Sequence, residues 1–335
     1  MTRARRPHLT VADHVRGVRA GDRAVLARTI TLIESSHPRH RAMAAQVLTA
    51  LAPFTGGALR VGLTGVPGVG KSTFVESLGL QLVESGHRLA VLAVDPSSAV
   101  SGGSILGDKT RMQRLAADPR AFIRPSPSQG TLGGVHRRTR ETLLLCEAAG
   151  YDVVLVETVG VGQSEASVAN MVDTFVVLVL AGAGDELQGI KKGVLELADV
   201  LAVNKADGPN VVAAKRRARE LERALHLVRQ RRSWWTPPVL SCSSIEGDGL
   251  ADVWQSVLAH RSELDSRGEL DVERARQRRA WMWARITEAL REQFEAHPGV
   301  ARCLPEVEAE LTAGTLSAAE ASERLLARFS GDADA

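Results

Sequence analysis

The amino-terminal part of the chain carries apolar residues at the spacing of amphipathic helices. Val11 and Val18 would lie on one helix face, and Thr10 in front of them is a residue type that caps helix starts. The same spacing recurs twice before two consecutive glycines, beginning with Gly56, interrupt it. We therefore expect an N-terminal helical domain over residues 1–56. Its predicted helices begin after Thr10, Asp22 and Pro38.

From residue 57 to about residue 260 the pattern changes to short apolar runs separated by helical stretches. Nearly continuous apolar strands that alternate with helices are typical of a parallel sheet covered by helices on both faces. The pattern therefore predicts an α/β domain over residues 57–260. Ligands of such sheets bind at the carboxyl ends of the strands. The predicted strands cover residues 59–65, 88–95, 151–157, 173–182, 199–207 and 237–244.

After residue 260 the chain is again helical and rich in arginine and glutamate, so residues 261–335 are expected to form a C-terminal helical arm. A capping box of Ser317 and Glu320 predicts its last helix. An apolar stripe on an earlier helix either packs on the chain's own core or meets a partner. The stripe consists of Trp283, Ile286, Leu290 and Phe294.

Composition and charge narrow the function classes. Apolar residues make up 44% of the chain, enough for a core, while 42 basic and 39 acidic residues are well mixed. Because nucleic-acid binding usually needs a concentrated basic face, we expect no nucleic-acid partner. Three separated cysteines indicate no disulfide framework. The first residues lack the apolar core of a secretory signal, and no apolar run could span a bilayer. We expect a cytoplasmic protein without a membrane partner.

The predicted strand that ends near residue 64 is followed by GVPGVGKST, and an amphipathic helix follows in turn. Two glycines that bracket four residues before Lys-Ser are typical of a phosphate-binding loop, whose backbone N–H groups surround phosphate oxygens. In such loops Lys71 contacts the β- and γ-phosphates and Ser72 binds Mg²⁺. The predicted nucleotide-binding residues here are Gly65, Val66, Pro67, Gly68, Val69, Gly70, Lys71, Ser72 and Thr73.

A second motif, NKAD at 204–207, lies at the end of a later predicted strand. A carboxylate at Asp207 can accept hydrogen bonds from N1–H and the exocyclic amine of guanine, whereas adenine offers no matching donors. SCSS at 241–244 lies at the end of the next predicted strand and matches the loop that covers guanine O6 in GTPases. The sequence therefore predicts GTP and GDP as ligands. The base-binding residues are predicted to be Asn204, Lys205, Asp207, Ser241, Cys242 and Ser243.

Glu157 lies at the carboxyl end of the third predicted strand, inside VVLVETVGVGQ. A carboxylate beside the phosphate loop can hold Mg²⁺ directly or through water. Signalling GTPases have Asp at this position, and Glu reaches one methylene further. Asp95 and Asp108, at a strand end and in a loop, are further candidate magnesium ligands, although solvated aspartates would look the same.

Hydrolysis is expected to be slow without a partner. Gln163 lies three positions after Gly160, whereas a water-positioning glutamine would follow that glycine directly, so we disfavour Gln163 for this role. The stretch AGAGDELQGIKKG at 181–193 has the glycines and charges of an order–disorder switch. We expect Lys71, Glu157 and Lys191 to act in hydrolysis, with Lys191 brought to the phosphates by a partner. A solvated surface loop is the alternative for this stretch.

Several stretches together resemble one family. They are GVPGVGKST, DPSS (95–98), SGGSILGDKTRM (101–112), RPSPSQGTLGGV (124–135), ETVGVGQSE (157–165), AGAGDELQGIKKG and NKAD. In this combination the chain resembles the MeaB/ArgK family of P-loop GTPases, which are associated with methylmalonyl-CoA mutase. The resemblance extends over roughly residues 10 to 330, and Ser101 stands where the family has threonine.

The resemblance implies an accessory GTPase for an adenosylcobalamin-dependent acyl-CoA mutase, methylmalonyl-CoA mutase being the leading client. Such a protein gates cofactor loading and protects or reactivates the mutase, with GTP hydrolysis as its switch. The family's fold is a helical N-terminal domain, a GTPase domain and a C-terminal dimerisation arm, so the resemblance also implies a homodimer. Carried over by position, its magnesium residues are Ser72, Asp95, Asp108 and Glu157.

Three other functions are compatible with parts of the pattern. An ATP-dependent kinase of amino-acid transport would share the phosphate loop, but NKAD disfavours adenine. A GTPase for metal insertion into another metalloenzyme would usually carry a histidine-rich tail or a Cys/His cluster, whereas the nine histidines here are scattered. A nucleic-acid-binding module is suggested by the basic stretch 214–235, which is more simply a solvated helix face.

Overall fold

The computed structural model describes residues 9–35, 37–94, 112–125, 132–158, 165–181, 192–226 and 231–331. The chain forms two compact units, Met1–Gln277 and Arg278–Ala335. None of the helices in the described ranges combines the length and apolarity needed to span a bilayer.

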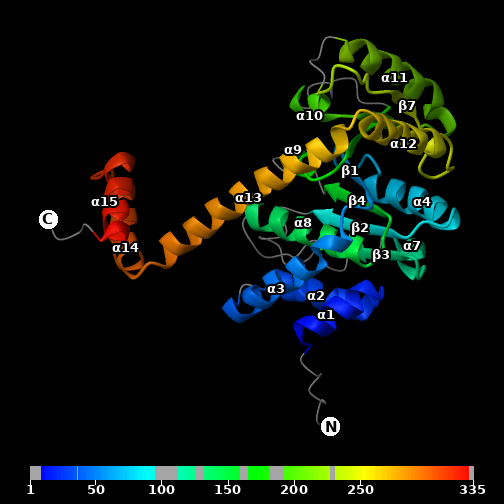
Figure 1. Ribbon diagram of the computed structural model, residues 1–335. Coiled ribbons are helices and arrows are strands. Elements are labelled where there is room, and N and C mark those ends of the chain that lie inside the picture. Colours follow the sequence, from blue (N-terminus) through cyan, green and yellow to red (C-terminus); the bar gives the residue numbers. More distant parts are fainter. Residues whose placement is uncertain are drawn as a thin grey trace, which may run out of the picture. The chain divides into compact units, whose positions relative to one another are not determined.

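A sheet of seven parallel strands forms the centre of the first unit (Figure 1). The strands are β1 (Leu59–Gly65), β2 (Leu89–Val94), β3 (Ala121–Arg124), β4 (Val153–Thr158), β5 (Thr174–Leu180), β6 (Val200–Asn204) and β7 (Val239–Ser241). Their order across the sheet is β3-β2-β4-β1-β5-β6-β7. The chain therefore places β2, β3 and β4 on one side of β1 and then β5, β6 and β7 on the other side, which makes the carboxyl end of β1 the switch point where ligands of such sheets bind.

Helices surround this sheet, as the alternating pattern predicted, and the α/β fold of a P-loop NTPase is confirmed. In the first unit they are α1 (Val11–Arg19), α2 (Arg23–Glu34), α3 (Pro38–Leu51), η1 (Ala52–Phe54), α4 (Lys71–Glu84), α7 (Gln113–Ala117), α8 (Leu132–Ala148), α9 (Glu165–Ala169), α10 (Lys192–Leu197), η2 (Gly208–Asn210), α11 (Val211–Leu225) and α12 (Leu250–Ser266). Helix α13 (Glu269–Ala296) begins in the first unit and ends in the second, which also holds α14 (Pro298–Thr312) and α15 (Ala318–Ser330).

The three N-terminal helices begin where the sequence predicted. Thr10 and Asp13 form a full capping box at the start of α1, and the Asp22 carboxylate accepts from two backbone N–H groups of α2. His37 caps α3 through its ring nitrogen, which accepts from the Arg39 backbone N–H. The helices contact one another and α8 (blue and green in Figure 1), and they bury Val18 and Leu26 on the sequence-predicted faces. Each fully buried side chain of this size contributes about 1.5–3 kcal/mol.

One strand, β3, was not predicted from the sequence. β3 is only four residues long and follows a polar stretch, so it gave no periodic signal. Several predicted strands are also shorter in the structure; β6 ends at Asn204, and the rest of NKAD forms a loop. The main division of the chain lies after Gln277. The separation into domains 1–56, 57–260 and 261–335 stays a prediction.

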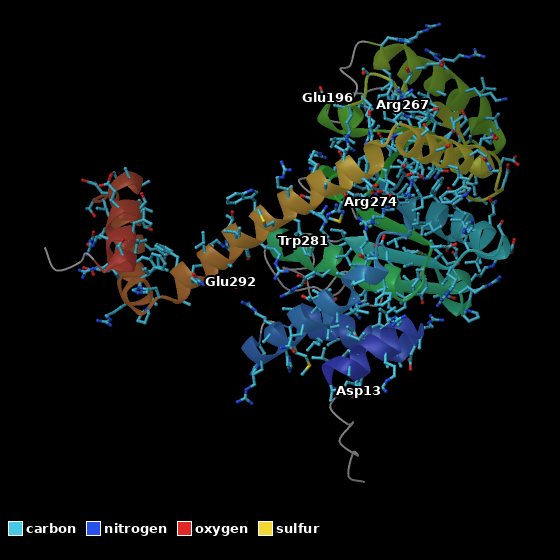
Figure 2. The ribbon with its side chains drawn as sticks, in the orientation of Figure 1. Asp13, Glu196, Arg267, Arg274, Trp281 and Glu292 are labelled. Carbon is cyan, nitrogen blue, oxygen red and sulfur yellow. The ribbon has the colours of Figure 1, made fainter. Side chains whose placement is uncertain are left out.

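Buried ion pairs fix the amino ends of β1 and β5. Asp173, which precedes β5 and is fully buried, accepts from the Arg60 backbone N–H at 3.0 Å. Its carboxylate also accepts from Arg274 Nε at 2.9 Å and Nη2 at 2.7 Å, and from Arg261 Nη1 at 3.1 Å. The Arg60 side chain pairs with Glu147 at 2.7 Å. Because Arg274 lies on α13 (labelled in Figure 2), the first turns of α13 are anchored to this edge.

A second buried carboxylate, Asp199, fixes the amino end of β6. It accepts from the Phe175 backbone N–H at 2.9 Å and from Arg232 Nη1 at 2.7 Å. The ring of His260 on α12 is 3.4 Å away, and Trp235 donates to the Asp199 carbonyl at 2.7 Å. Trp234 and Trp235 pack beside the ring of His260.

The second unit has a small apolar core of its own. Cys303, Val307 and Ala321 are buried between α14 and α15, and the predicted Ser317–Glu320 capping box starts α15. Phe294, at the end of the predicted stripe, contacts Phe329. The other three stripe residues have large exposed fractions, 60% for Trp283, 38% for Ile286 and 55% for Leu290.

Candidate functional site

The phosphate loop leaves β1 at Gly65 and enters α4 at Lys71. Gly68 and Gly70 have φ angles of 81° and 93°, in the left-handed region that favours glycine. A Cβ at Gly65 would lie 2.6 Å from the Leu178 carbonyl oxygen, and one at Gly70 would lie 2.9 Å from Asn204 Nδ2. The glycine spacing is therefore required by the close approach of β5 and β6 to the loop.

Lys71, at the first position of α4, has an exposed fraction of only 7%. Its ammonium donates to the Gly65 carbonyl at 2.7 Å and to the Val66 carbonyl at 3.3 Å. Burial lowers the pKa of Lys71 below its usual value, while the carboxylates of Glu157 and Glu165 oppose this. Phosphate oxygens are stronger partners for an ammonium than carbonyl oxygens, so this loop suits a phosphate-bearing ligand.

Ser72 and Glu157 meet beside Lys71. The Ser72 hydroxyl donates to Glu157 Oε1 at 3.2 Å, and Glu157, near the end of β4, has an exposed fraction of 4%. Behind them the hydroxyls of Thr64 and Thr158 lie 2.7 Å apart and join β1 to β4. A hydroxyl and a carboxylate are oxygen ligands of the kind that Mg²⁺ prefers, so this pair fits the predicted ion.

Asn204 joins the phosphate loop to the loop after β7. Its Nδ2 donates to the Val69 carbonyl at 2.8 Å, and its Oδ1 accepts from both the backbone N–H and the hydroxyl of Ser244, at 3.1 and 2.8 Å. The side chain is fully buried. Its amide therefore fixes the distance between the two ligand loops.

The predicted base-binding loops also contact each other at Asp207. The Ser243 hydroxyl donates to Asp207 Oδ2 at 2.8 Å, and the Ala206 N–H donates to the Cys242 carbonyl at 3.0 Å. Lys205 has a φ angle of 61°, which is uncommon for a residue with a side chain and indicates a conformation held by its surroundings. This constraint turns Asp207 back toward the loop after β7.

The structure thus brings together most of the predicted residues that it describes. Thr73 is exposed on the first turn of α4, and Ser241 is the last residue of β7. Cys242 is buried, with Sγ 3.7 Å from Asn204 Oδ1, and burial raises the pKa of its thiol to about 12. The predicted residues Asp95, Asp108, Gly160, Gln163 and Lys191 lie outside the described residues.

Two residues of the site were not predicted. Ser244, the last residue of SCSS, holds Asn204, and its place in the motif was the available signal. Glu165, which ends ETVGVGQSE and starts α9, is buried and close enough to Lys71 to oppose the fall in its pKa. No spacing rule connects Glu165 to the phosphate loop, so the pattern of residues did not single it out.

Comparison with known proteins identifies the family. The model of the family described as "Methylmalonyl Co-A mutase-associated GTPase MeaB" matches residues 26–299. A probable GTPase of Mycobacterium tuberculosis is 56% identical over 95% of this chain and 94% of its own length. GTPase ArgK of Escherichia coli is 52% identical over 82% of each chain. The mitochondrial methylmalonic aciduria type A homolog of Mus musculus is 47% identical over 93% of this chain and 78% of its own.

A solved structure gives the same result at the level of the fold. The crystal structure of a protein named LAO/AO transport system kinase superposes with a TM-score of 0.76 at 39% identity, over 98% of this chain and 100% of that one. The family match, the high identity to named GTPases and the phosphate loop at the switch point agree with one another. The chain belongs to the family of P-loop GTPases described as methylmalonyl-CoA mutase-associated GTPase MeaB.

Proposed function

We propose that this GTPase binds GTP with Mg²⁺ at the carboxyl edge of its sheet and serves an adenosylcobalamin-dependent acyl-CoA mutase. In this role it gates cofactor loading and protects or reactivates the mutase. The observation that supports guanine-nucleotide binding best is the pair of contacts made by Asn204. Through them the phosphate loop and the loop after β7 are held at a fixed separation.

In this proposal each part of the site has a distinct task. Lys71 exchanges its carbonyl partners for the β- and γ-phosphates, and Asp207 accepts from the guanine base. Ser72 and Glu157 hold Mg²⁺ together with Asp95 and Asp108, whose positions match the family's motifs. When bound, the ion neutralises charge that develops on the phosphate oxygens. The remaining proposed nucleotide contacts are Gly65–Gly70, Thr73, Asn204, Lys205 and Ser241–Ser243.

The choice of client rests on the family. The family description names methylmalonyl-CoA mutase, and the mouse relative is named after methylmalonic aciduria. These names support methylmalonyl-CoA mutase as the partner in preference to another metalloenzyme. The solved relative is named as a kinase, which is a different reaction, and the Asp207 carboxylate favours guanine over adenine. A measured preference for ATP would point to that alternative.

We further propose that the mutase accelerates hydrolysis through the segment around Lys191. The decisive experiment measures GTP turnover of the full-length protein alone and with methylmalonyl-CoA mutase. Lys191→Ala should leave GTP affinity and basal turnover nearly unchanged and remove most of the stimulation. Lys192→Ala, one position further along, is the matched control and should retain it. Stimulation that survives in Lys191→Ala, or a parallel fall in both rates, would exclude this relay.

A homodimer is the final part of the proposal. Trp283 and Leu290 expose 60% and 55% of their surfaces on the second unit, more than a solvated helix face requires. A symmetric partner would cover these side chains. Light scattering of Trp283→Asp/Leu290→Asp should give the monomer mass where the wild type gives the dimer mass. A wild type that is monomeric at micromolar concentration, or a variant that stays dimeric, would refute this arrangement.

A further inference from the structure

Helix α4 carries a serine whose hydroxyl binds outside the helix. Ser77 lies in the interior of α4 and is half-buried. A serine inside a helix usually points to water or donates back to a carbonyl of its own helix, and it forms helices less well than alanine does. Ser77 instead donates to the Ser244 carbonyl at 2.5 Å, across 167 positions of the chain. The contact joins the helix that follows the phosphate loop to the loop after β7.

The next turn of α4 faces the same loop. Gln81 is four positions after Ser77, so the two side chains lie on one face of the helix. A Cβ added at Gly247 would lie 3.6 Å from Gln81 Nε2. The loop itself is closed by two backbone hydrogen bonds of 2.9 Å, from Gly247 N–H to the Ser243 carbonyl and from Ser243 N–H to the Asp248 carbonyl. This face of α4 therefore meets a loop that is held in one conformation.

Ser244 is held from two sides. Its N–H and its hydroxyl donate to Asn204 Oδ1 at 3.1 and 2.8 Å, while its carbonyl accepts from Ser77. Asn204 in turn donates to the Val69 carbonyl of the phosphate loop at 2.8 Å. Ser244 has an exposed fraction of only 4%. The contacts form a closed ring from the phosphate loop through Asn204, Ser244 and Ser77 to α4, and along the helix back to Lys71.

The two sides of this ring restrict different motions. Hydrogen bonds to a single oxygen of Asn204 still allow the loop after β7 to turn about that oxygen. A second contact, from Ser77 on another element, removes this freedom. We propose that Ser77 is a positioning residue for guanine recognition, because it fixes the loop after β7 relative to the helix that begins with Lys71. The inference rests on the proposed guanine-nucleotide site and adds to it a residue that acts through Ser244.

This role affects GTP and ATP differently. In the proposed site GTP uses the guanine contacts at Asp207 and in the loop after β7 as well as the phosphate loop. ATP offers the same phosphates but no matching hydrogen-bond donors to Asp207, so its binding depends mainly on the phosphate loop. A loop after β7 that is less well fixed should therefore weaken GTP binding more than ATP binding. A general loss of structure would weaken both.

Three variants isolate the hydroxyl of Ser77. Ser77→Ala removes it and favours the helix, because alanine is the better helix former. Ser77→Thr keeps a hydroxyl at the same position. Ser85→Ala is the matched control, since Ser85 ends the same helix, is exposed and donates at 2.8 Å to the Gln81 carbonyl of that helix. The control thus removes the same group from α4 without a contact to the loop after β7.

Equilibrium titration of the full-length protein with a fluorescent GTP analogue and Mg²⁺, with GTP and ATP as competitors, measures both affinities. The wild type should prefer GTP. Ser77→Ala should weaken GTP binding by about threefold to tenfold, the effect of one lost hydrogen bond, and change ATP binding by less than about twofold. Ser77→Thr and Ser85→Ala should bind both nucleotides within about twofold of the wild type.

Several outcomes would overturn this role. One is a Ser77→Ala variant with wild-type GTP affinity, and another is an equal fall in its GTP and ATP affinities. Ser77→Thr binding GTP as weakly as Ser77→Ala, or Ser85→Ala losing as much as Ser77→Ala, would do the same. A wild type that does not prefer GTP contradicts the guanine site and with it the role of Ser77. A wild type that prefers GTP, together with an unchanged Ser77→Ala, contradicts the role of Ser77 alone.

Discussion

The two edges of the sheet hold buried charges in different ways. At the amino edge, the carboxylates of Asp173 and Asp199 are paired with arginines of the same chain. At the carboxyl edge, the ammonium of Lys71 donates to carbonyl oxygens and the carboxylate of Glu157 accepts from the hydroxyl of Ser72. Buried charges that are matched within the chain resist a change of partner. A buried ammonium held by carbonyl oxygens can instead exchange them for phosphate.

The two ends of the same strands therefore have different tasks. The amino ends contribute to the stability of the fold, and the carboxyl ends form the nucleotide site. β1 and β5 are fixed at their amino ends through Asp173 and Arg60, and β5 and β6 through Asp199. Strands fixed in this way present their opposite ends in a constant register, which the phosphate loop between β1 and α4 requires. The arginine-rich edge is therefore expected to govern folding, and the glycine-rich edge nucleotide binding.

The largest expected effect is loss of stability at the amino edge. Asp173→Ala would leave Arg274 and Arg261 without their shared carboxylate in a buried setting, which typically costs about 3–5 kcal/mol. Asp152→Ala is the matched control, because Asp152 also precedes a strand but its side chain is 53% exposed. The control should cost about 1 kcal/mol or less. Urea denaturation measures both, and equal losses would contradict a special role for the buried pair.

The second largest expected effect is a loss of GTP turnover when a side chain at the carboxyl edge is removed. Lys71→Ala should lower GTP turnover by about 10²–10³-fold, as expected when a preorganised donor to the phosphates is lost. The free energy of unfolding should fall by less than in Asp173→Ala, because the ammonium of Lys71 donates its hydrogen bonds to carbonyl oxygens and only adds a charge near Glu157 and Glu165. Steady-state turnover and urea denaturation of the same preparation give both numbers. Unfolding at the level of Asp173→Ala would erase the distinction between the edges.

Local chemistry made one part of this structure predictable. Thr10 and Asp22 cap helices through neighbouring N–H groups, and the glycines around Lys71 are tied to one turn, so short motifs were sufficient. The pairing of Asp173 with Arg274 was not predictable, because the two residues are 101 positions apart and no spacing rule joins them. β3 was missed for lack of length, and Ser244, in the loop after β7, because its partner Asn204 lies 40 positions earlier at the end of β6.

The third expected effect is the pH dependence of the free energy of unfolding, which two buried groups at the amino edge determine. Burial, reinforced by Arg232 and Arg231, lowers the pKa of His260 to about 3, from the 6.5 expected of an unfolded chain. Burial raises the pKa of Asp199 to about 6, from 3.8, against the charges of the same arginines. Below pH 6.5 only the unfolded state protonates His260, which lowers stability. Below pH 6 only the folded state protonates Asp199, which raises it.

The wild-type free energy of unfolding should therefore change little between about pH 6 and pH 4, since the two slopes have opposite signs. His260→Gln removes one of them, so its stability should rise on acidification in this window, by at most about 1.4 kcal/mol per pH unit. Urea denaturation at three pH values measures the slope. A variant that is as flat as the wild type, or that loses stability on acidification, would show that Asp199 is ionised throughout.

Base selection by Asp207 is the sharpest test of a guanine-nucleotide site assembled around Asn204 at the carboxyl edge. Equilibrium titration should show that the wild type binds GTP far more tightly than ATP or xanthosine triphosphate. In Asp207→Asn the amide nitrogen can donate to the second carbonyl of xanthine, but the side chain can accept only one of the two hydrogen bonds that guanine offers. We predict that this variant loses about tenfold to a hundredfold in GTP affinity and gains affinity for xanthosine triphosphate. Unchanged GTP affinity in the variant, or equal binding of ATP and GTP by the wild type, would rule out such a site.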